Sequence, residues 1–385
     1  MEALTNAPGG PTAAPPAPPA SVPAHREYPC VQCGAKVRFD PGAASLKCPY
    51  CGAEAAIPKS AEDVEELDFN EALSRLAGLE DSVQVPDMAC SACGARVSLP
   101  PGEASGACPF CGSPAVAAGG SARRIKPKSL LPFKVTRGNA WASFRRWIDG
   151  LWFAPNALKR HAREEQKLSG VYVPYWTYDS RTTSWYTGER GEDYWATEHY
   201  TTTVNGRSVS RTRQVRRTRW YPASGVVWNL FDDVLVLASK SLPKERAEEL
   251  EPWDLKNLVP FKEDYLSGFR AESYSVNLEQ GFAAAREVMD EGIRASIRRD
   301  IGGDHQRIHT VKTRHDTITF KHLLLPVWIS AYRYGDKVYR VLVNARTGEV
   351  QGERPWSWVK IALLVLGILG AVAGAAAIIA SASGH

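Results

Sequence analysis

The sequence predicts an α+β protein with two small four-cysteine zinc ribbons, a duplicated mixed body of helices and β-hairpins, and one C-terminal transmembrane helix. Three observations predict this class. All eight cysteines fall into two quartets of equal spacing, two phrases of the middle region occur twice, and a long uncharged apolar stretch lies near the end. A chain of 385 residues is long enough for two or three domains, each with its own core.

Composition divides the chain into successive segments. The first 27 residues are rich in Pro and Ala and lack the apolar core of a signal peptide, so we expect a disordered lead. The segments that follow are a ribbon at 28–57, a linker with a short helix at 58–88, a second ribbon at 89–117, two halves of the body at 123–250 and 251–355, and a tail anchor at 359–381.

The cysteines predict two metal centres. Each quartet consists of two CxxC pairs with fourteen residues between them, and the two 23-residue segments share thirteen identities without a gap. Four thiolates at this spacing are typical of tetrahedral Zn²⁺, and four Cys leave no open position for catalysis. We therefore expect two structural zinc ions; disulfides and an iron–sulfur or rubredoxin-like iron site are the alternatives. The ligands are Cys30, Cys33, Cys48 and Cys51 in the first centre, and Cys90, Cys93, Cys108 and Cys111 in the second.

Between the ribbons, Asp68 is predicted to cap a short helix through Phe69, Ala72, Leu73 and Leu76, with Gly78 as its stop. In the body, the phrases LLPFK at 130–134 and LVPFK at 258–262 are each followed by helical sequence and then by a Pro-x-Trp strand, at 174–176 and 326–328. We interpret the body as two related halves.

Helices are predicted in both halves of the body. In the first half, Asn139 is predicted to cap a helix that buries Trp141, Phe144 and Ile148, and Pro155 opens another helix that ends near Lys167. In the second half, apolar residues recur at helical spacing, with Gly302 and Gly303 beyond the end. These are Leu278, Phe282, Ala285, Met289, Ile293 and Ile297.

The strands are predicted at Val171–Tyr178 and Leu323–Tyr334, which are aromatic and β-branched. The second continues as a three-stranded meander through turns at Gly335-Asp336 and Thr347-Gly348. A Pro within each Pro-x-Trp strand favours a sheet edge or a bulge.

A basic segment predicts a hairpin arm. Asn205-Gly206 is a two-residue turn signal that sets Val204 opposite Arg207, so each following Arg meets a carboxylate or an aromatic ring. We interpret the arm as self-paired and exposed to solvent; contact with anionic lipid headgroups or with nucleic acid is the alternative. The Arg residues that would make this anionic-surface contact are Arg207, Arg211, Arg213, Arg216, Arg217 and Arg219.

Catalytic patterns are missing from the sequence. It has no phosphate-binding loop, no nucleophile elbow and no kinase signature, so we expect no enzyme. His305 and His309 lie four residues apart, but the surrounding pattern is strand and no acidic partner in sequence completes a metal set. Asp232 and Asp233 interrupt an apolar strand, which favours a turn or edge role over shared-proton chemistry.

The stretch from Ile361 to Ala380 is long enough to cross a bilayer as a helix. Arg354 and Lys360 flank its entry and no Lys or Arg follows its exit, which places the N-terminal portion in the cytoplasm. We therefore expect a single-pass protein of the cytoplasmic (inner) membrane. Gly370 and Gly374 form a GxxxG pair, the pattern of a helix that packs against a second copy.

The ribbons, the two Pro-x-Trp strands, the stretches Thr218 to Trp220 and Phe231 to Asp233, and the tail together resemble a family of bacterial membrane-anchored zinc-ribbon proteins. The ribbons themselves are similar to those of transcription factor IIB. Members often carry a label borrowed from the primosomal replication helicase, and some relatives are linked to phage shock protein A-like membrane-stress proteins. The resemblance implies a soluble partner of that kind.

Two functions are compatible with these patterns. The first is a non-enzymatic adaptor that displays the two ribbons on a mobile stalk at the cytoplasmic membrane and recruits soluble proteins. The second is a membrane-tethered nucleic-acid-binding protein that uses the ribbons and the Arg-rich hairpin at 207–219.

Overall fold

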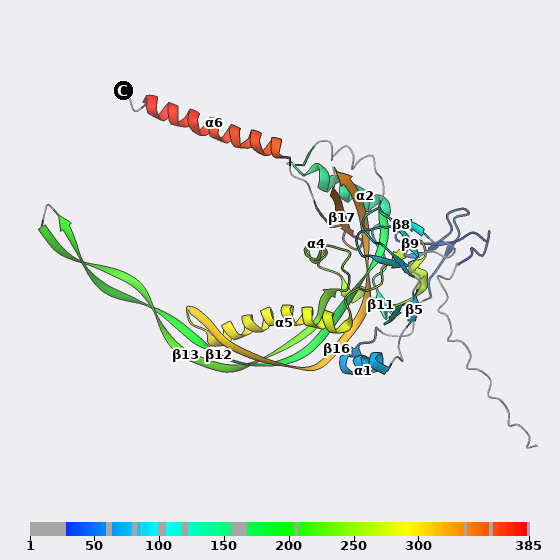
Figure 1. Cartoon of the computed structure of the whole chain (residues 1–385), viewed down its shortest axis with the longest axis horizontal. Coiled ribbons are helices and arrows are strands. Elements are labelled where there is room, and N and C mark those ends of the chain that lie inside the picture. Colours follow the sequence, from blue (N-terminus) through cyan, green and yellow to red (C-terminus); the bar gives the residue numbers. More distant parts are fainter. Residues whose placement is uncertain are drawn as a thin grey trace, which may run out of the picture.

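The computed structural model describes residues 28–58, 64–78, 83–85, 87–98, 105–117, 122–152, 154–155, 168–204, 207–334, 337–353 and 357–382. The predicted lead at 1–27, the helix predicted after Pro155, the turns at 205–206 and 335–336, and Arg354 lie outside these ranges. Figure 1 shows a mixed α+β body from which a long curved β-arm and a single helix project.

A nine-stranded mixed sheet organises the body. Its centre is β12 (Ser169–Val204), which pairs antiparallel with β13 (Arg207–Leu237) on one side and with β16 (His305–Tyr334) on the other. These strands continue far beyond the predicted ones and form the arm (Figure 1). Shorter strands complete the sheet: β4 (Leu67–Asp68), β11 (Ser129–Leu130), β14 (Val259–Pro260), β15 (Arg270–Ala271), β17 (Lys337–Asn344) and β18 (Val350–Gly352). β16, β17 and β18 confirm the predicted meander.

Alternation along β12 separates the two faces of the sheet. Val171 and Val173 lie on one face with the second ribbon and with the residues that follow α4 (Lys244–Glu248). Tyr172 lies on the opposite face with the first ribbon and α2 (Arg137–Asp149), and Trp176 on that face contacts α1 (Phe69–Gly78) and α5 (Leu278–Ile301). The sheet is therefore covered by a cysteine module on each face.

α5 follows the predicted helical stripe. Asn277 begins it with a capping box, in which its side chain accepts from Gln280 N while the Gln280 side chain accepts from Asn277 N. Leu278, Ala285, Met289, Ile293 and Ile297 are buried against the sheet, as predicted, and Phe282 is partly buried. Gly302 ends the helix with a φ of 66°.

The beginning of α2 corrects one prediction. The N-cap is Thr136 and not Asn139, because Thr136 Oγ1 accepts from Asn139 N at 3.3 Å. Phe144 and Ile148 are buried as predicted, whereas Trp141 is only partly buried. The cap of α1 is confirmed: Asp68 Oδ1 accepts from Glu71 N at 2.8 Å.

The Pro-x-Trp strands do not lie at an edge, which corrects a second prediction. Pro174 on β12 faces Leu324 on β16, and Tyr172 faces Pro326, between further strands on either side. Each Pro lies just before the pairing with a neighbouring strand begins: the β12–β13 pairing starts at Tyr175, and the β16–β17 pairing starts at Val327. The missing N–H therefore removes no ladder bond, and Pro is tolerated inside the sheet.

The two halves make matching hydrogen bonds. Trp176 Nε1 donates to Val276 O at 3.0 Å, and Trp328 Nε1 donates to Val135 O at 2.9 Å; each acceptor immediately precedes a helix N-cap. Ala238 N donates to Pro174 O at 3.0 Å, and Ala345 N donates to Pro326 O at 3.1 Å. The Trp side chains of the two Pro-x-Trp strands therefore have similar acceptors, and the Pro carbonyl groups of the two strands have similar donors.

Close approach of α5 to the sheet requires a glycine. A Cβ at Gly281 would lie 2.3 Å from the Tyr178 hydroxyl and 2.8 Å from Trp176 Cδ1. We expect Gly281→Ala to destabilise the protein by about 1–3 kcal/mol, because overpacking outweighs the gain of about 1 kcal/mol in helix propensity. Thermal unfolding checks this. Gly292→Ala on the same helix, whose nearest contact is Phe231 at 3.0 Å, should cost less; a stabilised Gly281→Ala variant would contradict the packing argument.

α6 (Trp358–Ala382) is the one helix of the described chain that is long and apolar enough to cross a membrane. The window Val359–Ala376 has a mean hydropathy of 2.3, and none of it is buried against the rest of the protein. Near its beginning, Lys360 Nζ donates to Ala154 O at 2.8 Å and to Trp152 O at 3.2 Å.

Candidate metal centres

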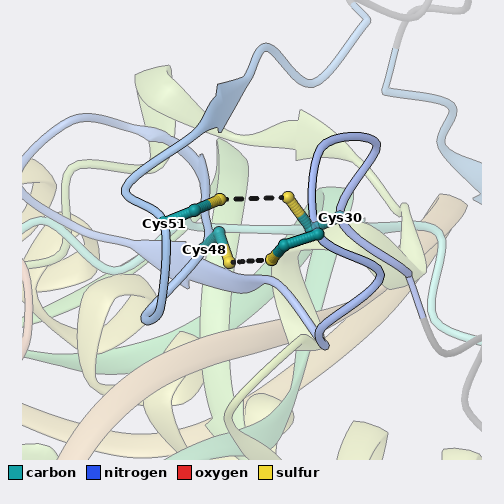
Figure 2. A group of neighbouring side chains, drawn as sticks. Cys30, Cys48 and Cys51 are labelled. Atoms are coloured by element: carbon teal, nitrogen blue, oxygen red, sulfur yellow. Dashed lines mark hydrogen bonds between the residues drawn. The ribbon is translucent and has the colours of Figure 1, made fainter.

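The first cysteine quartet converges on one point (Figure 2). Cys30 Sγ lies 3.5 Å from Cys51 Sγ, Cys33 Sγ lies 3.5 Å from Cys48 Sγ, and all four sulfurs lie within 4.8 Å of one another. A disulfide needs about 2.05 Å. Four sulfurs at about 2.3 Å from a tetrahedral ion are about 3.8 Å apart, so the quartet has the geometry of a metal centre.

The second quartet repeats this arrangement. Cys90 Sγ lies 3.5 Å from Cys111 Sγ, and Cys93 Sγ lies 3.6 Å from Cys108 Sγ. All eight cysteines are free of disulfides. The structure therefore brings together both predicted ligand sets, and each offers four sulfurs to one ion.

Each CxxC pair forms a tight backbone turn, called a knuckle, and this turn explains the Gly that follows the second Cys. Gly34 N donates to Cys30 O at 2.8 Å, and Gly34 has a φ of 72°, a conformation that glycine adopts without strain. Gly112 repeats this with a φ of 72° and a bond of 2.8 Å to Cys108 O. Each knuckle thus turns tightly enough to aim both of its sulfurs at the same ion.

Hydrogen bonds favour the thiolate form of some sulfurs in each centre, Cys30 and Cys48 in the first and Cys108 in the second. Backbone N–H groups of Cys51 and Tyr50 lower the pKa of Cys48 to about 6. A hydrogen bond from Cys93, aided by backbone N–H groups of Phe110 and Cys111, lowers the pKa of Cys108 to about 5. Because the thiolate is the species that binds metal, these donors prepare each site for a cation.

Both ribbons are built into the body, so the predicted mobile stalk is wrong for the residues that the structure describes. In the first ribbon, with β1 (Arg38–Asp40), β2 (Ser45–Lys47) and β3 (Glu54–Ala55), Phe39 N donates to Ser267 O at 3.0 Å. Ser267 Oγ donates to Val37 O at 2.7 Å. Since backbone groups are shared, the ribbon is a fixed part of the fold.

The second ribbon is bound more deeply. It comprises β6 (Asp87–Ala89), β7 (Arg96–Ser98), β8 (Ser105–Ala107) and β9 (Pro114–Ala117), and its Val97 makes a β-bridge with Glu272 of the body. Arg340 Nε donates to Phe110 O at 3.0 Å. Cys90, Cys108 and Cys111 are all buried, whereas Cys33 and Cys51 of the first ribbon are exposed.

The arm has the predicted register. Val204 pairs with Arg207, Tyr200 with Arg211, and Glu198 with Arg213, as the Asn-Gly signal requires. Glu198 accepts from Arg213 at 2.6 Å and from Arg217 at 3.2 Å, Arg216 pairs with Asp193, and the Arg219 guanidinium lies 4.9 Å from the Tyr194 ring centroid. Much of the basic charge is therefore used within the arm, while Arg207 and Arg211 are exposed.

The two histidines lie at the beginning of β16, where His305 faces Gly191 of β12. His305 Nε2 is 3.1 Å from Asp193 Oδ2, and His309 Nε2 is 3.5 Å from Glu189 Oε2. Each imidazole therefore lies beside a different carboxylate, and each carboxylate is shared with an Arg, Arg216 at Asp193 and Arg307 at Glu189. Neither belongs to a group of three or more metal-ligating side chains in the described part of the chain.

A polar cluster around the buried Lys321 was not predicted from the sequence. Lys321, whose side chain is 7% exposed, lies 3.0 Å from Glu66 and 2.7 Å from Asp233. Asp179 Oδ1 accepts from Asp233 N at 2.6 Å, and Asp233 has a φ of 54° on β13, the outermost strand. Carboxylate oxygens of Asp179, Asp232 and Asp233 lie within 4.8 Å of one another. The Lys321 ammonium group, which pairs with Asp233, is the positive charge beside these carboxylates. The edge role predicted for the Asp pair thus includes a salt bridge to the sheet centre.

This cluster predicts a pH dependence. Burial, and to a smaller extent the Glu66 carboxyl, raises the pKa of Asp179 to about 6. Because the folded form binds this proton more tightly than the unfolded chain, its stabilising contribution is complete below about pH 4 and is lost as the pH rises through 6. We expect Asp179→Asn to be more stable than the wild type at pH 7 by about 1 kcal/mol, and the difference to vanish towards pH 4.

Paired urea titrations of the two proteins between pH 4 and 8 check this expectation. Asp232→Asn, at the exposed neighbouring carboxylate, is the matched control and should show no such trend. An Asp179→Asn variant that is less stable than the wild type at pH 7 would mean that the carboxylate is needed in its charged form.

The fold and the two quartets define a class: an α+β protein with two four-cysteine candidate metal centres and one candidate membrane helix. The chain is similar to the uncharacterized protein YdjG of Bacillus subtilis (strain 168), with 25% identity over 357 residues. The alignment covers 89% of this chain and 94% of the relative. No protein-family model and no solved structure matches the chain.

Proposed function

We propose that this protein is a non-enzymatic adaptor of the cytoplasmic membrane, anchored by α6, with two structural zinc ions and a cytoplasmic body that recruits a soluble protein. The observation that carries the proposal is the packing of two closed four-cysteine centres on opposite faces of one sheet. Four sulfurs occupy all four coordination positions of a tetrahedral ion, so such a centre stabilises structure and offers no position for substrate. A rigid body beside an exposed apolar helix fits a display scaffold better than an enzyme.

Zinc is the metal that fits these sites best. Structural four-cysteine sites with CxxC knuckles are typical zinc sites, and reducing cytoplasm keeps the thiols available. The cytoplasmic placement of the body rests on the positive-inside tendency, with Lys360 at the entry of α6. Gly370 and Gly374 would support a dimer of two anchors, since a Cβ at either position would meet no described neighbour.

The proposal includes membership of the bacterial membrane-anchored zinc-ribbon family, with a phage shock protein A-like partner. Similarity to the uncharacterized YdjG over 89% of the chain is compatible with this membership, because an alignment of that length extends into the body.

We also propose that the body arose by duplication. The matching Trp and Pro hydrogen bonds support this origin, because each Trp donates to the residue before a helix N-cap of the other half. Thr136 then corresponds to Asn277, so α2 corresponds to α5. The phrases LLPFK and LVPFK meet in the sheet, where β11 pairs antiparallel with β14, an arrangement open to two equivalent strands related by a twofold axis.

The adaptor is tested by affinity purification of the full chain from detergent-solubilised membranes under low and high salt. The expected result is a soluble protein recovered in a fixed ratio to the bait. An unrelated tail-anchored bait is the control for detergent effects. Recovery of no stoichiometric partner at any salt concentration would argue against the adaptor.

A membrane-tethered nucleic-acid-binding protein is the second candidate. It is favoured by the exposed Arg207 and Arg211 at the end of the arm and by Trp195, which is 69% exposed. This candidate requires binding of an oligonucleotide that weakens steeply with salt, and a further loss when Arg211, Arg213 and Arg217 are changed to Gln. A flat salt response would remove it.

A further inference from the structure

The sheet is covered unequally on its two faces where β12, β13 and β16 pass α5 (Figure 1). On one face, the apolar stripe of α5 packs against Tyr186 and Val227. Because successive residues of a strand point to opposite faces, Trp185 and Trp228 lie on the other face. In the described part of the chain that face is open: Trp228 and Leu230 are each 73% exposed, and Trp185 is 41% exposed.

Trp185, Trp228 and Leu230 together form an apolar patch. Trp228 and Leu230 lie two residues apart on β13, so both point to the open face. Trp185 pairs with Val226 and is therefore the diagonal neighbour of Trp228. Diagonal neighbours in a sheet lie about 7–8 Å apart, within the reach of an aromatic side chain. Grouped exposed apolar side chains mark interaction sites, and Trp is enriched among the residues that dominate binding.

Positive charge borders the apolar patch. Arg181, Lys312 and Arg314 point to the same open face from β12 and β16, and all three are exposed. Arg314 pairs with Asp316 at 3.0 Å, and its guanidinium carbon lies 5.9 Å from the Trp185 ring centroid. Arg181 and Lys312 have no carboxylate partner among the residues that the structure describes. The rim of the patch therefore offers two cations to the carboxylates of a partner.

Charge and position decide which occupant fits the apolar patch. A second copy of this chain would bring the same cations face to face, and like charges repel. Figure 1 shows α5 and α6 on the same side of the arm, so the patch is turned away from the membrane anchor. A nucleic acid fits less well, because it needs many phosphate contacts and this rim has two uncommitted cations. An acidic protein segment satisfies both the charge and the position.

We propose that the apolar patch binds the apolar side of an amphipathic helix in a soluble partner protein, with carboxylates of that helix against Arg181 and Lys312. α5 shows that these strands accept a helix, since its apolar stripe packs on all three of them from the opposite face. A partner helix on the open face completes a third layer of the fold. The inference rests on the proposed adaptor function and names the chemistry of its partner.

The test uses two synthetic amphipathic peptides of about 18 residues, or about five helical turns. Both carry the same Leu stripe, which is flanked by Glu in one peptide and by Lys in the other. Binding to the full chain in nanodiscs of neutral phosphatidylcholine is measured by fluorescence anisotropy, with empty nanodiscs as the background. We expect the Glu peptide to bind at least about tenfold more tightly than the Lys peptide, because only its charge complements the rim.

Variants of the apolar patch locate the binding site. Trp228→Ser/Leu230→Ser is expected to weaken binding of the Glu peptide at least about tenfold, because large side chains at the centre of an interface contribute most of the binding free energy. The matched control Trp152→Ser/Val288→Ser removes an exposed Trp and an exposed aliphatic residue outside the patch and should bind as the wild type does.

Reversal of the rim charge gives a result that damage to the fold would not produce. Arg181→Glu/Lys312→Glu is expected to lose affinity for the Glu peptide and to gain affinity for the Lys peptide. Two metal ions per chain in every variant show that the ribbons remain folded. No binding of the Glu peptide, equal binding of the two peptides, equal loss in both Ser variants, or displacement of the Glu peptide by oligo-dT or by anionic vesicles would each overturn the patch proposal.

Membrane pull-downs separate failure of the inference from failure of the adaptor. A partner recovered equally by the wild type and by Trp228→Ser/Leu230→Ser would refute the apolar patch alone. A wild-type bait that recovers no partner would refute the adaptor, whatever the peptides show.

Discussion

Cys108→Ser is expected to reduce the metal content from two ions per chain to one and to unfold the body. Cys108 is 2% exposed and belongs to the same core as Phe110, Leu131 and Val173. Binding of structural zinc contributes about 10–16 kcal/mol in small finger peptides, which is as large as the whole stability of an ordinary domain. Loss of this centre therefore removes one side of the main core.

The first ribbon offers the comparison. Cys51→Ser should also reduce the metal content to one ion, but Cys51 is exposed and its neighbour Tyr50 contacts solvent. The expected damage is smaller than for Cys108→Ser, because Cys51 itself lies outside both core clusters, although Cys30 and Cys48 of the same centre belong to the second cluster. Metal release by a thiol-blocking reagent and cooperative thermal unfolding by circular dichroism measure both effects.

Ser91→Ala, at an exposed position of the same module as Cys108, is the control and should retain two ions. If Cys108→Ser kept both ions, or if Cys51→Ser unfolded the body as completely as Cys108→Ser, the unequal role of the two centres would be refuted.

The unequal burial was hidden in the sequence, although the centres themselves were not. The CxxC spacing and its Gly fix the local turn, so the ligand set follows from short-range chemistry. The packing of Phe110 depends on the sheet below it, while the same position in the first ribbon, Tyr50, has no such surface. Thirteen identities in 23 residues therefore do not imply equal surroundings.

The arm shows which features the sequence patterns predict and which they do not. Asn-Gly fixed its register residue by residue, because a two-residue turn leaves one pairing. The strand lengths were underestimated, since beyond Asp179 much of the arm is solvated and the apolar alternation of a half-buried strand fades. The salt bridge of Lys321 with Glu66 was equally unreadable, because the two residues are 255 positions apart and only the folded sheet brings them together.

Removal of residues 358–385 is expected to move the protein from the membrane pellet to the soluble fraction. Leu363, Leu366 and Leu369 of α6 are more than half exposed, and such side chains each favour insertion by about 0.3–0.6 kcal/mol at the centre of a bilayer. The truncated chain should retain two metal ions, because none of the eight cysteine ligands lies on α6. Carbonate extraction, followed by metal analysis of the soluble protein, measures both results.

The mechanism of membrane binding is decided by point variants of the same helix. Leu366→Arg places a charge near the middle of α6 and costs about 2.5–3.5 kcal/mol, so extraction should become easier, while the conservative Leu366→Ile should behave as the wild type does. A truncated protein that still sediments with membranes would assign the attachment to the basic arm and not to α6. In that case, changing Arg207 and Arg211 to Gln would release it, and salt would do the same, since an electrostatic contact is screened whereas an inserted helix is not.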